Sequence, residues 1–250
     1  MLSGFYTIAS GMMQQQRSLN VLGNNIVNAK TPGFRAARVV STTFDYELTM
    51  RMEQGNTAVI GSSSPIRVTE EVPVRFDSGS LEETGRPYDM AIDGPGFFQI
   101  QGEGGARYLT RNGNFDQDAE GYLVLRGAGR VLGTGGNPIR VQGADFTVLE
   151  NGQIQGPTGN NLGTLSVVTV PEGAEIRSNQ NGLYSIDNMN QVQQVAAPQV
   201  AQNWLERTNI DVTQEYAMVM EAQRAFQACS SALQILDRLN QKAATQIASV

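Results

Sequence analysis

The first 29 residues carry apolar side chains at helical spacing. One apolar row recurs every seventh position, and a second row lies three places after it, as on one face of an α-helix. Pro32 ends this pattern, because it has no backbone N–H and disfavours the helical conformation at Thr31. The sequence therefore predicts an N-terminal amphipathic helix. Its apolar face comprises Phe5, Met12, Leu19, Leu22 and Ile26.

Residues 211–250 show a stricter heptad pattern. Two rows of apolar or small residues run through this segment, the second row three places after the first, which is typical of a coiled-coil seam. Asp211 and Gln214 have the spacing of a capping box, so we expect the helix to run from Val212 to about Ile247. The seam comprises Val212, Val219, Phe226 and Leu233, with Ala222, Cys229 and Leu236 in the second row.

Between these segments the pattern changes to short apolar runs with alternating polar positions, separated by Asn-Gly and other turn pairs. Frequent Gly and Asn favour an irregular antiparallel barrel or sandwich. We therefore predict an α+β protein, in which long N- and C-terminal helices pair as a coiled coil and a β domain lies between them in sequence. Strands are expected at 65–76, 97–101, 107–110, 122–125, 146–149 and 164–170.

Changes in composition divide the chain into five segments. The stretch before residue 65 is polar and ends in Gly61-Ser62-Ser63-Ser64, which favours an extended or flexible segment. Gln and Asn are frequent before the last helix, which suggests a linker. The predicted segments are the N-terminal helix and turn at 1–40, the extended segment at 41–64, the central β domain at 65–187, the linker at 188–210 and the C-terminal helix at 211–250.

Composition removes most enzyme chemistry. The chain has no histidine, which excludes the usual catalytic triads and most zinc sites, and its single cysteine cannot close an intrachain disulfide. A formal net charge of −6 argues against binding to nucleic acid or to anionic lipid. We expect no enzymatic activity, no catalytic residue, no cofactor and no metal. Cys229 is interpreted as a small core residue.

Two short segments are candidates for ligand binding, but neither has the residue spacing that its binding motif requires. Residues 116–121 mimic half of a calcium loop, but Gly127 stands where the loop needs a bidentate Glu. Residues 127–133 are rich in glycine, but the spacing departs from the dinucleotide fingerprint and no helix is expected after them. Both segments are better explained as turns of the β domain.

The two helical seams already suggest a function. Two long helices with apolar faces, at opposite ends of the chain, would bury those faces on each other and on neighbouring molecules. From the pattern alone, the β domain is the body of the subunit and the paired termini are its polymerisation device.

Four blocks of sequence support this hypothesis from another direction. In order along the chain they are LGNNIVNAKTPGF at 22–34, DMAIDGPGFF at 89–98, YLTRNGNF at 108–115, and TNIDVTQEY at 208–216 running into EAQRAF at 221–226. Together they resemble the flagellar basal-body rod and hook protein family. The blocks cover both ends and the middle of the chain, so the resemblance is far more specific than one short motif.

The resemblance implies a structural subunit of the bacterial flagellar basal-body rod. Its terminal helices would form the inner layer of a tubular polymer that transmits torque from motor to hook. The implied partners are further copies of the chain, other rod proteins above and below, and the flagellar type III export apparatus, which exports subunits to the cell envelope without a cleaved signal peptide. Residues placed by the resemblance at the turn after the first helix or at neighbouring helices are Asn24, Asn25, Asn28, Gly33, Phe34, Gln223, Arg224 and Phe226.

Within the family the chain looks most like the proximal rod protein that carries a β domain. The segments that favour it are 32–35, 85–89, 110–114 and 181–184. The distal rod protein is the alternative. Outside the family, the alternatives are a surface carbohydrate- or protein-binding β module on a helical stalk, and a hydrolase with a pair of carboxylates.

Overall fold

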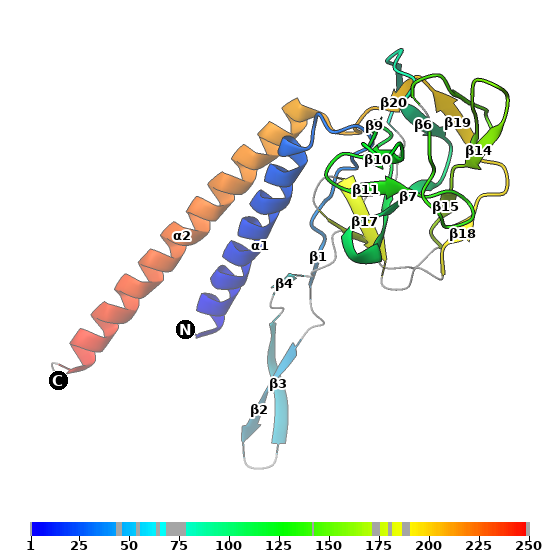
Figure 1. Cartoon of the computed structure of the whole chain (residues 1–250). Coiled ribbons are helices and arrows are strands. Elements are labelled where there is room, and N and C mark those ends of the chain that lie inside the picture. The colour runs from blue at the N-terminus through cyan, green and yellow to red at the C-terminus, as the bar shows by residue number, and fades with distance from the viewer. Residues whose placement is uncertain are drawn as a thin grey trace. The chain divides into compact units, whose positions relative to one another are not determined.

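The structure, a computed structural model, separates the chain into two compact units (Figure 1). We call the first the helical unit; it comprises Met1–Ile26, Ala37–Pro73 and Asp211–Val250. The second, the β unit, comprises Val27–Ala36 and Val74–Ile210. The residues described are 2–43, 47–53, 56–63, 66–68, 79–141, 143–171, 176–179, 182–186 and 191–248.

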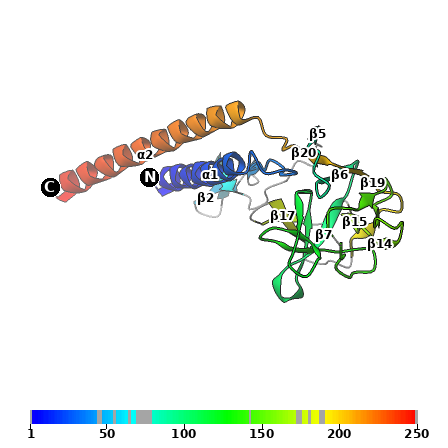
Figure 2. The same cartoon turned by 45° about the horizontal axis from the view of Figure 1, so that its top comes forward.

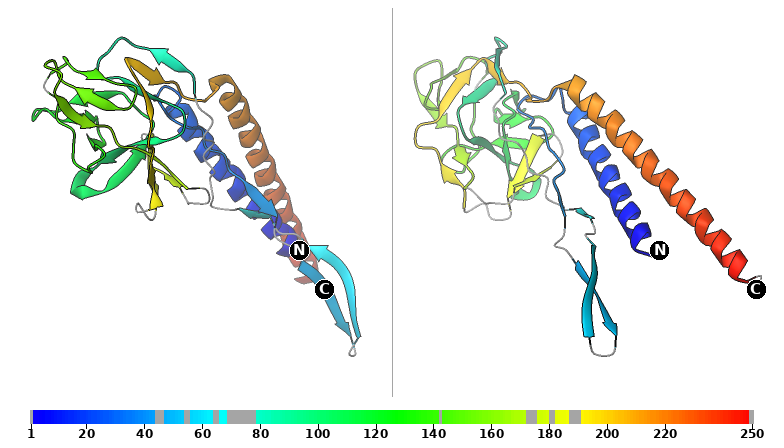
Figure 3. Two further views of the ribbon diagram at one scale, coloured as in Figure 1. Left: turned by 90° about the vertical axis from the view of Figure 1, so that its right-hand side faces the viewer. Right: turned by 180° about the vertical axis from the view of Figure 1, so that it is seen from behind.

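Two long helices dominate the helical unit. Helix α1 (Leu2–Val27) has 26 residues and helix α2 (Val212–Ala248) has 37. They run antiparallel in every view (Figures 1, 2 and 3). The Asn25 amide donates to the Glu215 carboxylate, and a Cβ placed on Gly11 would lie 3.8 Å from the Cys229 sulfur. In both pairs the residue numbers add to 240, which defines the register and leaves the last turns of α2 beyond the start of α1.

The observed helix ends follow local chemistry. The predicted stripe of α1 reached Ala29, but the helix ends at Val27, because Asn28 to Lys30 form a turn and the Thr31 N–H donates to the Asn28 carbonyl at 2.9 Å. The predicted start of α2 is confirmed. Asp211 accepts hydrogen bonds from the N–H groups of Thr213 and Gln214 at 2.9 and 3.3 Å, as an N-cap residue does.

Four short strands complete the described part of the helical unit. Strands β2 (Glu47–Glu53) and β3 (Asn56–Ser63) pair as an antiparallel hairpin, and β1 (Ser41–Thr43) pairs with β4 (Ile66–Val68) (Figure 3). The segment expected to be extended or flexible thus contains backbone pairing. Of the strand predicted at 65–76, only β4 lies within the described residues.

The β unit contains sixteen described strands and one short 3₁₀ helix, η1 (Glu103–Gly105). The largest sheet has nine strands, in the order β16-β17-β8-β7-β11-β10-β9, with β15 pairing β7 and β18. Its strands are β7 (Phe97–Gln101), β8 (Arg107–Thr110), β9 (Phe115–Gln117), β10 (Leu123–Leu125), β11 (Gly129–Val131), β15 (Val167–Thr169), β16 (Ile176–Ser178), β17 (Leu183–Ile186) and β18 (Gln193–Gln194).

Smaller sheets lie beside it. The sheet β12-β13-β14 has three strands, and β19 pairs with β6 while β20 pairs with β5. All pairs between described strands are antiparallel and the two helices contact each other, so the α+β prediction is confirmed. These strands are β5 (Leu81–Glu83), β6 (Met90–Asp93), β12 (Thr147–Val148), β13 (Gln153–Gln155), β14 (Asn161–Thr164), β19 (Gln199–Gln202) and β20 (Trp204–Glu206).

The stretch predicted as a linker at 188–210 differs most from expectation. Its described part contributes β18, β19 and β20 to the β unit. Val200 lies opposite Ile92 in the β19–β6 pair, and Leu205 lies opposite Glu82 in the β20–β5 pair. Strand pairing uses backbone N–H and C=O groups, so a Gln-rich segment can form strands although it has few apolar side chains. The other predicted domain limits remain predictions.

The β unit has two apolar core clusters, and the larger one joins residues from several sheets. The rings of Phe98 and Phe115, both fully buried, meet edge to face with centroids 5.1 Å apart. Ile100, Leu123 and Ile154 are fully buried in the same cluster. This core fixes the strands that present the residues described below. Of the helices described, none is both long and apolar enough to cross a membrane.

Candidate functional site

A tight turn after α1 brings the chain into the β unit. Gly33 has a φ of +66°, a conformation that glycine adopts most readily. Its N–H donates to the Glu206 carbonyl at 2.7 Å, and a Cβ at this position would lie 2.3 Å from the Arg111 carbonyl carbon and oxygen. Position 33 therefore needs glycine for two reasons: its backbone conformation and the close approach of residue 111. The predicted turn at Gly33 is confirmed.

Phe34, the next residue, is buried within the β unit. A Cβ on Gly182 would lie 3.8 Å from the Phe34 ring, and the Gly182 carbonyl accepts a hydrogen bond from the Thr110 hydroxyl at 3.0 Å. The Arg35 N–H donates to the Tyr184 hydroxyl at 3.3 Å. Three sequence blocks that lie far apart along the chain, around residues 34, 110 and 183, therefore meet at one place.

At the centre of this place lies a buried group of charges, which we call the Glu206 cluster: Arg35, Arg111, Tyr184 and Glu206. The Glu206 side chain pairs with the Arg35 guanidinium at 2.5 Å and with the Arg111 guanidinium at 3.3 Å. Glu206 is 2% exposed and also accepts the Gly79 N–H at 2.9 Å. A carboxylate so buried needs these partners, because an unpaired charge in the interior is strongly unfavourable.

Arg111 extends the cluster to the strands beside it. Its guanidinium donates to the carbonyls of Ile92 and Gly94 at 3.3 and 2.7 Å and lies 5.5 Å from the Phe97 ring centroid. Burial lowers the pKa of Arg111, and the neighbouring Glu206 carboxylate opposes that shift. Burial raises the pKa of Tyr184 to about 12, so its phenol is neutral. The cluster is a structural connection between segments that lie far apart in the sequence.

A second polar group, which we call the Asn25 clamp, lies in the helical unit and comprises Asn25, Ala37, Arg38 and Glu215. The Asn25 amide donates to the Ala37 carbonyl at 2.9 Å and accepts the Ala37 N–H at 3.0 Å, so the side chain pairs with backbone as a strand would. It also donates to Glu215 at 3.2 Å, and the other Glu215 oxygen binds Arg38. Glu215 is 1% exposed. The clamp ties α1, the segment after it, and α2.

The other predicted interface residues divide by exposure. Leu22 and Ala222 are buried, and the remaining seam positions are half-buried except Phe5 and Val212, which are exposed. Asn24, Gln223 and Arg224 are exposed, and Asn28 accepts a hydrogen bond from the Thr31 hydroxyl at 3.3 Å. Their role in assembly remains a prediction. The half-buried positions are Met12, Leu19, Ile26, Val219, Phe226, Leu233 and Leu236.

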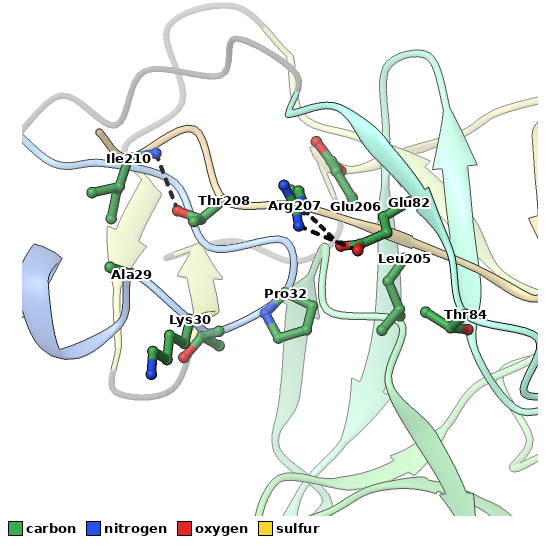
Figure 4. Close-up of a pocket in the computed structure, with 11 residues that line it drawn as sticks. Ala29, Lys30, Pro32, Glu82, Thr84, Leu205, Glu206, Arg207, Thr208 and Ile210 are labelled. Atoms are coloured by element: carbon green, nitrogen blue, oxygen red, sulfur yellow. Dashed lines mark hydrogen bonds and ion pairs between the residues drawn. The ribbon is translucent and has the colours of Figure 1, made fainter. Parts of the chain in front are cut away.

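A shallow hollow of about 400 Å³ lies in the β unit next to the turn (Figure 4). Lys30 and Pro32 line one side, and Leu205 contributes an apolar wall. Glu82 and Arg207, which also line the hollow, form an exposed bidentate ion pair. The Arg207 Nε and Nη2 atoms donate to the two Glu82 carboxylate oxygens at 2.6 and 3.2 Å. These two charges neutralise each other, and the hollow shows no group of side chains arranged for catalysis.

The possible calcium loop is a hairpin turn, as expected. Asp116 pairs with Arg126, and Asp118 and Glu120 both pair with Arg130. Hydrogen bonding to the Gln117 N–H is the main influence lowering the pKa of Asp116. Arginine side chains thus already form ion pairs with the carboxylates that a cation would need. Among the residues that the structure describes, no three acidic or cysteine side chains are placed to hold a metal ion.

Sequence reasoning found Asn25, Gly33 and Phe34 but missed the charges that they accompany. Arg35, Arg111 and Glu215 stand inside or directly beside the sequence blocks singled out above, and Glu206 lies two residues before the last block. A charged residue embedded in such a block was the available signal. It was not used because exposed charge is the default expectation.

The fold and these contacts define a structural protein: a helix pair and a β unit whose buried charges are neutralised internally. Models of three related families match the chain. "Flagella basal body rod protein" matches residues 5–35, "Flagellar hook protein FlgE/F/G D1 domain" matches 91–219, and "Flagellar basal body rod FlgEFG protein C-terminal" matches 201–247.

Full-length relatives agree. The chain is 30% identical over 254 residues to the flagellar basal-body rod protein FlgF of Caulobacter vibrioides, covering 99% of each chain. It is 30% identical over 249 residues to the rod protein FlgG of Agrobacterium fabrum, covering 92% of this chain and 94% of the relative. It is 30% identical over 277 residues to the hook-basal body complex protein FlhO of Bacillus subtilis, covering all of both chains. The chain belongs to the flagellar basal-body rod protein family, and it is a structural subunit of the rod rather than an enzyme.

Replacing Glu206 tests the buried cluster. Glu206→Gln leaves two buried guanidinium groups without their counter-charge, so we expect the free energy of unfolding to fall by about 3–5 kcal/mol. Urea denaturation measures the change. Glu82→Gln is the matched control, because Glu82 pairs with Arg207 at the surface and its replacement should shift the midpoint little. Equal effects of the two changes would contradict the role given to Glu206.

Replacing Gly33 tests the turn. Gly33→Ala adds a Cβ that must displace the backbone at Arg111 and also strains the positive φ, which alone disfavours alanine by about 1–2 kcal/mol. We expect a lower melting temperature and less soluble protein. Gly23→Ala, in α1 with no atom within 4 Å of the added Cβ, should be neutral or stabilise by up to about 1 kcal/mol. A Gly33→Ala protein as stable as the Gly23→Ala protein would show that the turn tolerates a side chain.

The raised pKa of the Tyr184 phenol predicts that the folded protein loses stability in alkali. The folded protein raises the pKa of this phenol to about 12, above the value of about 10 in an unfolded chain. The folded state therefore holds the proton more tightly, so this contribution is fully present below about pH 10 and is lost as pH rises toward about 12. Urea midpoints followed across this range should fall more steeply in the native protein than in Tyr184→Phe. Parallel pH profiles would exclude Tyr184 as the cause.

Proposed function

We propose that this subunit polymerises through α1 and α2 into a tubular shaft that transmits torque from the flagellar motor to the hook. The observation that carries the proposal is the distribution of exposed apolar side chains. Of eleven large apolar residues exposed in the described chain, nine lie on the two helices. They are Phe5, Tyr6, Met13, Val27, Val212, Tyr216, Met220, Ile235 and Leu239.

Such a surface is unsuited to a free monomer. The β unit buries its own core and exposes few large apolar groups, whereas each helix keeps apolar side chains outside the α1–α2 contact. Exposed apolar surface concentrated on one part of a protein marks an interaction site. Burial of each such side chain contributes about 1.5–3 kcal/mol, so a few contacts per subunit, repeated along a polymer, stabilise it substantially. The partners are further copies and the rod proteins above and below.

We assign the subunit to the proximal part of the rod. The segments that resemble the proximal protein are connected in the β unit: Asp89 accepts a hydrogen bond from the Asn114 amide at 3.1 Å, Gly33 packs on Arg111, and Phe34 lies against Gly182. The chain would reach the cell envelope through the flagellar type III export apparatus.

Electron microscopy tests the position. An epitope inserted after Thr158, in an exposed turn between β13 and β14, should leave both helices unchanged. Antibody labelling of hook–basal bodies from cells that carry only the tagged chain is expected to mark the rod next to the export gate. Labelling nearer the hook would make the chain a distal rod subunit. Purified hook–basal bodies that lack the tagged chain would refute a place in the rod.

A further inference from the structure

One short segment connects parts of the β unit that lie far apart in the sequence. Residues 203–207, which we call the closing segment, contain β20, and β20 pairs with β5 (Figure 2). The Asn203 N–H donates to the Asp89 carbonyl at 2.8 Å, and the Asn203 carbonyl accepts the Thr84 N–H at 2.7 Å. Through Glu206 the segment also contacts Gly33, Arg35, Gly79 and Arg111.

All of these partners lie much earlier in the chain. The nearest is Arg111, 95 positions before Glu206, and Gly79 lies 127 positions before it. A loop of that length must close before such contacts can form, and loop closure costs conformational entropy. Contacts of large sequence separation therefore form slowly. The closing segment is thus expected to dock after the segments that it joins.

The apolar core is built from other segments. The described residues of both core clusters, the partly buried ones included, lie between Tyr88 and Val200. In the closing segment Trp204 and Leu205 are half-buried, and the buried side chain is the charged one of Glu206. The core can therefore assemble through apolar contacts before the closing segment adds its polar contacts.

A bend at Asn203 separates β20 from the strand before it. Asn203 has a φ of +68°, and among the described residues it is the only one other than glycine with a positive φ. Asparagine adopts this conformation more readily than most residues do. The bend leaves β19 paired with β6 and turns β20 to β5. Because β19 carries the core residue Val200, the core holds β19, whereas β20 is held by its own contacts.

Glu206 supplies the charge that the docking site requires. Burial lowers the pKa of Arg111, and repulsion by the Arg35 guanidinium lowers it further. The Glu206 carboxylate pairs with both guanidinium groups, so its arrival allows them to be buried side by side. Burial of the two cations and docking of β20 are therefore coupled.

We propose that the closing segment is a latch that docks last: the core of the β unit assembles first, and entry of Glu206 between Arg35 and Arg111 then completes the fold. This order of folding is independent of the proposed function. Only residues 207–250 follow Glu206 in the chain. A chain that emerges N-terminus first, from a ribosome or from an export channel, therefore completes its β unit only after most of it has emerged.

Refolding of the full chain tests the order of events. Trp204 is the only tryptophan and lies in β20, so its fluorescence reports docking of the latch. After dilution from urea, pulsed hydrogen exchange read by mass spectrometry should show β7 and β8 protected before β20. Trp204 fluorescence should reach its native value only when β20 becomes protected. Protection of β20 together with β7 and β8, or before them, would overturn the proposal.

Glu206→Gln tests the charge of the latch by rates. Contacts that form after the folding transition state act mainly on unfolding, so we expect the unfolding rate constant to rise about a hundredfold or more and the refolding rate constant to change less than about threefold.

The matched control is Glu82→Gln, which removes the exposed pair that Glu82 makes with Arg207 of the same segment. It should change either rate constant by less than about twofold. Refolding of the Glu206→Gln protein slowed about tenfold or more would place Glu206 in the folding nucleus and refute a late latch. If this variant does not fold, hydrogen exchange of the native chain decides.

Discussion

The β unit depends on the burial of one carboxylate. Glu206 brings a negative charge into an interior where it is tolerated only with counter-charges and hydrogen-bond donors around it. Those donors come from Arg35, Arg111 and the backbone of Gly79, which lie far apart in sequence. Apolar packing could supply comparable stability at this place, but it would not demand these particular partners. The cluster therefore fixes which segments meet, in addition to whatever it contributes to stability.

The same requirement explains the turn before it. Arg35 can reach Glu206 only if the chain passes close to strand β8, and Gly33 is the residue that permits this approach, through its positive φ and its missing side chain. The Gly33 N–H then bonds to the carbonyl of Glu206 itself. Sequence blocks that lie far apart along the chain thus meet in one group of contacts. In the helical unit, Asn25 solves a similar problem with an amide, because it must pair with both backbone groups of Ala37 and still donate to Glu215.

Local periodicity predicted what depends on local chemistry. The heptad rows and the Asp211 cap predicted α2 closely, and short apolar runs predicted β7 and β8. Two things were not predictable in this way. Strands β18 to β20 have little apolar alternation, since their place is decided by backbone pairing with strands already held by the core. Glu206 and Arg35 pair across 171 positions, and no periodic signal reports a contact of that separation. The segment expected to be a linker and the charges expected to be exposed were misjudged for this common reason.

The composition of α1 suits the enclosed position that the proposed assembly gives it. A charged side chain on a helix enclosed by other helices would have to be desolvated or paired, which is strongly unfavourable unless a counter-charge is built into each neighbour. Amides and hydroxyls avoid this conflict, because they hydrogen-bond equally well to water in a free chain and to backbone or side chains in an assembled one. Helix α1 uses Gln, Asn and Ser for its polar positions and keeps a single charge. Such a helix can leave water on all sides without leaving an unpaired charge, whereas α2 carries exposed arginines at positions 224 and 238.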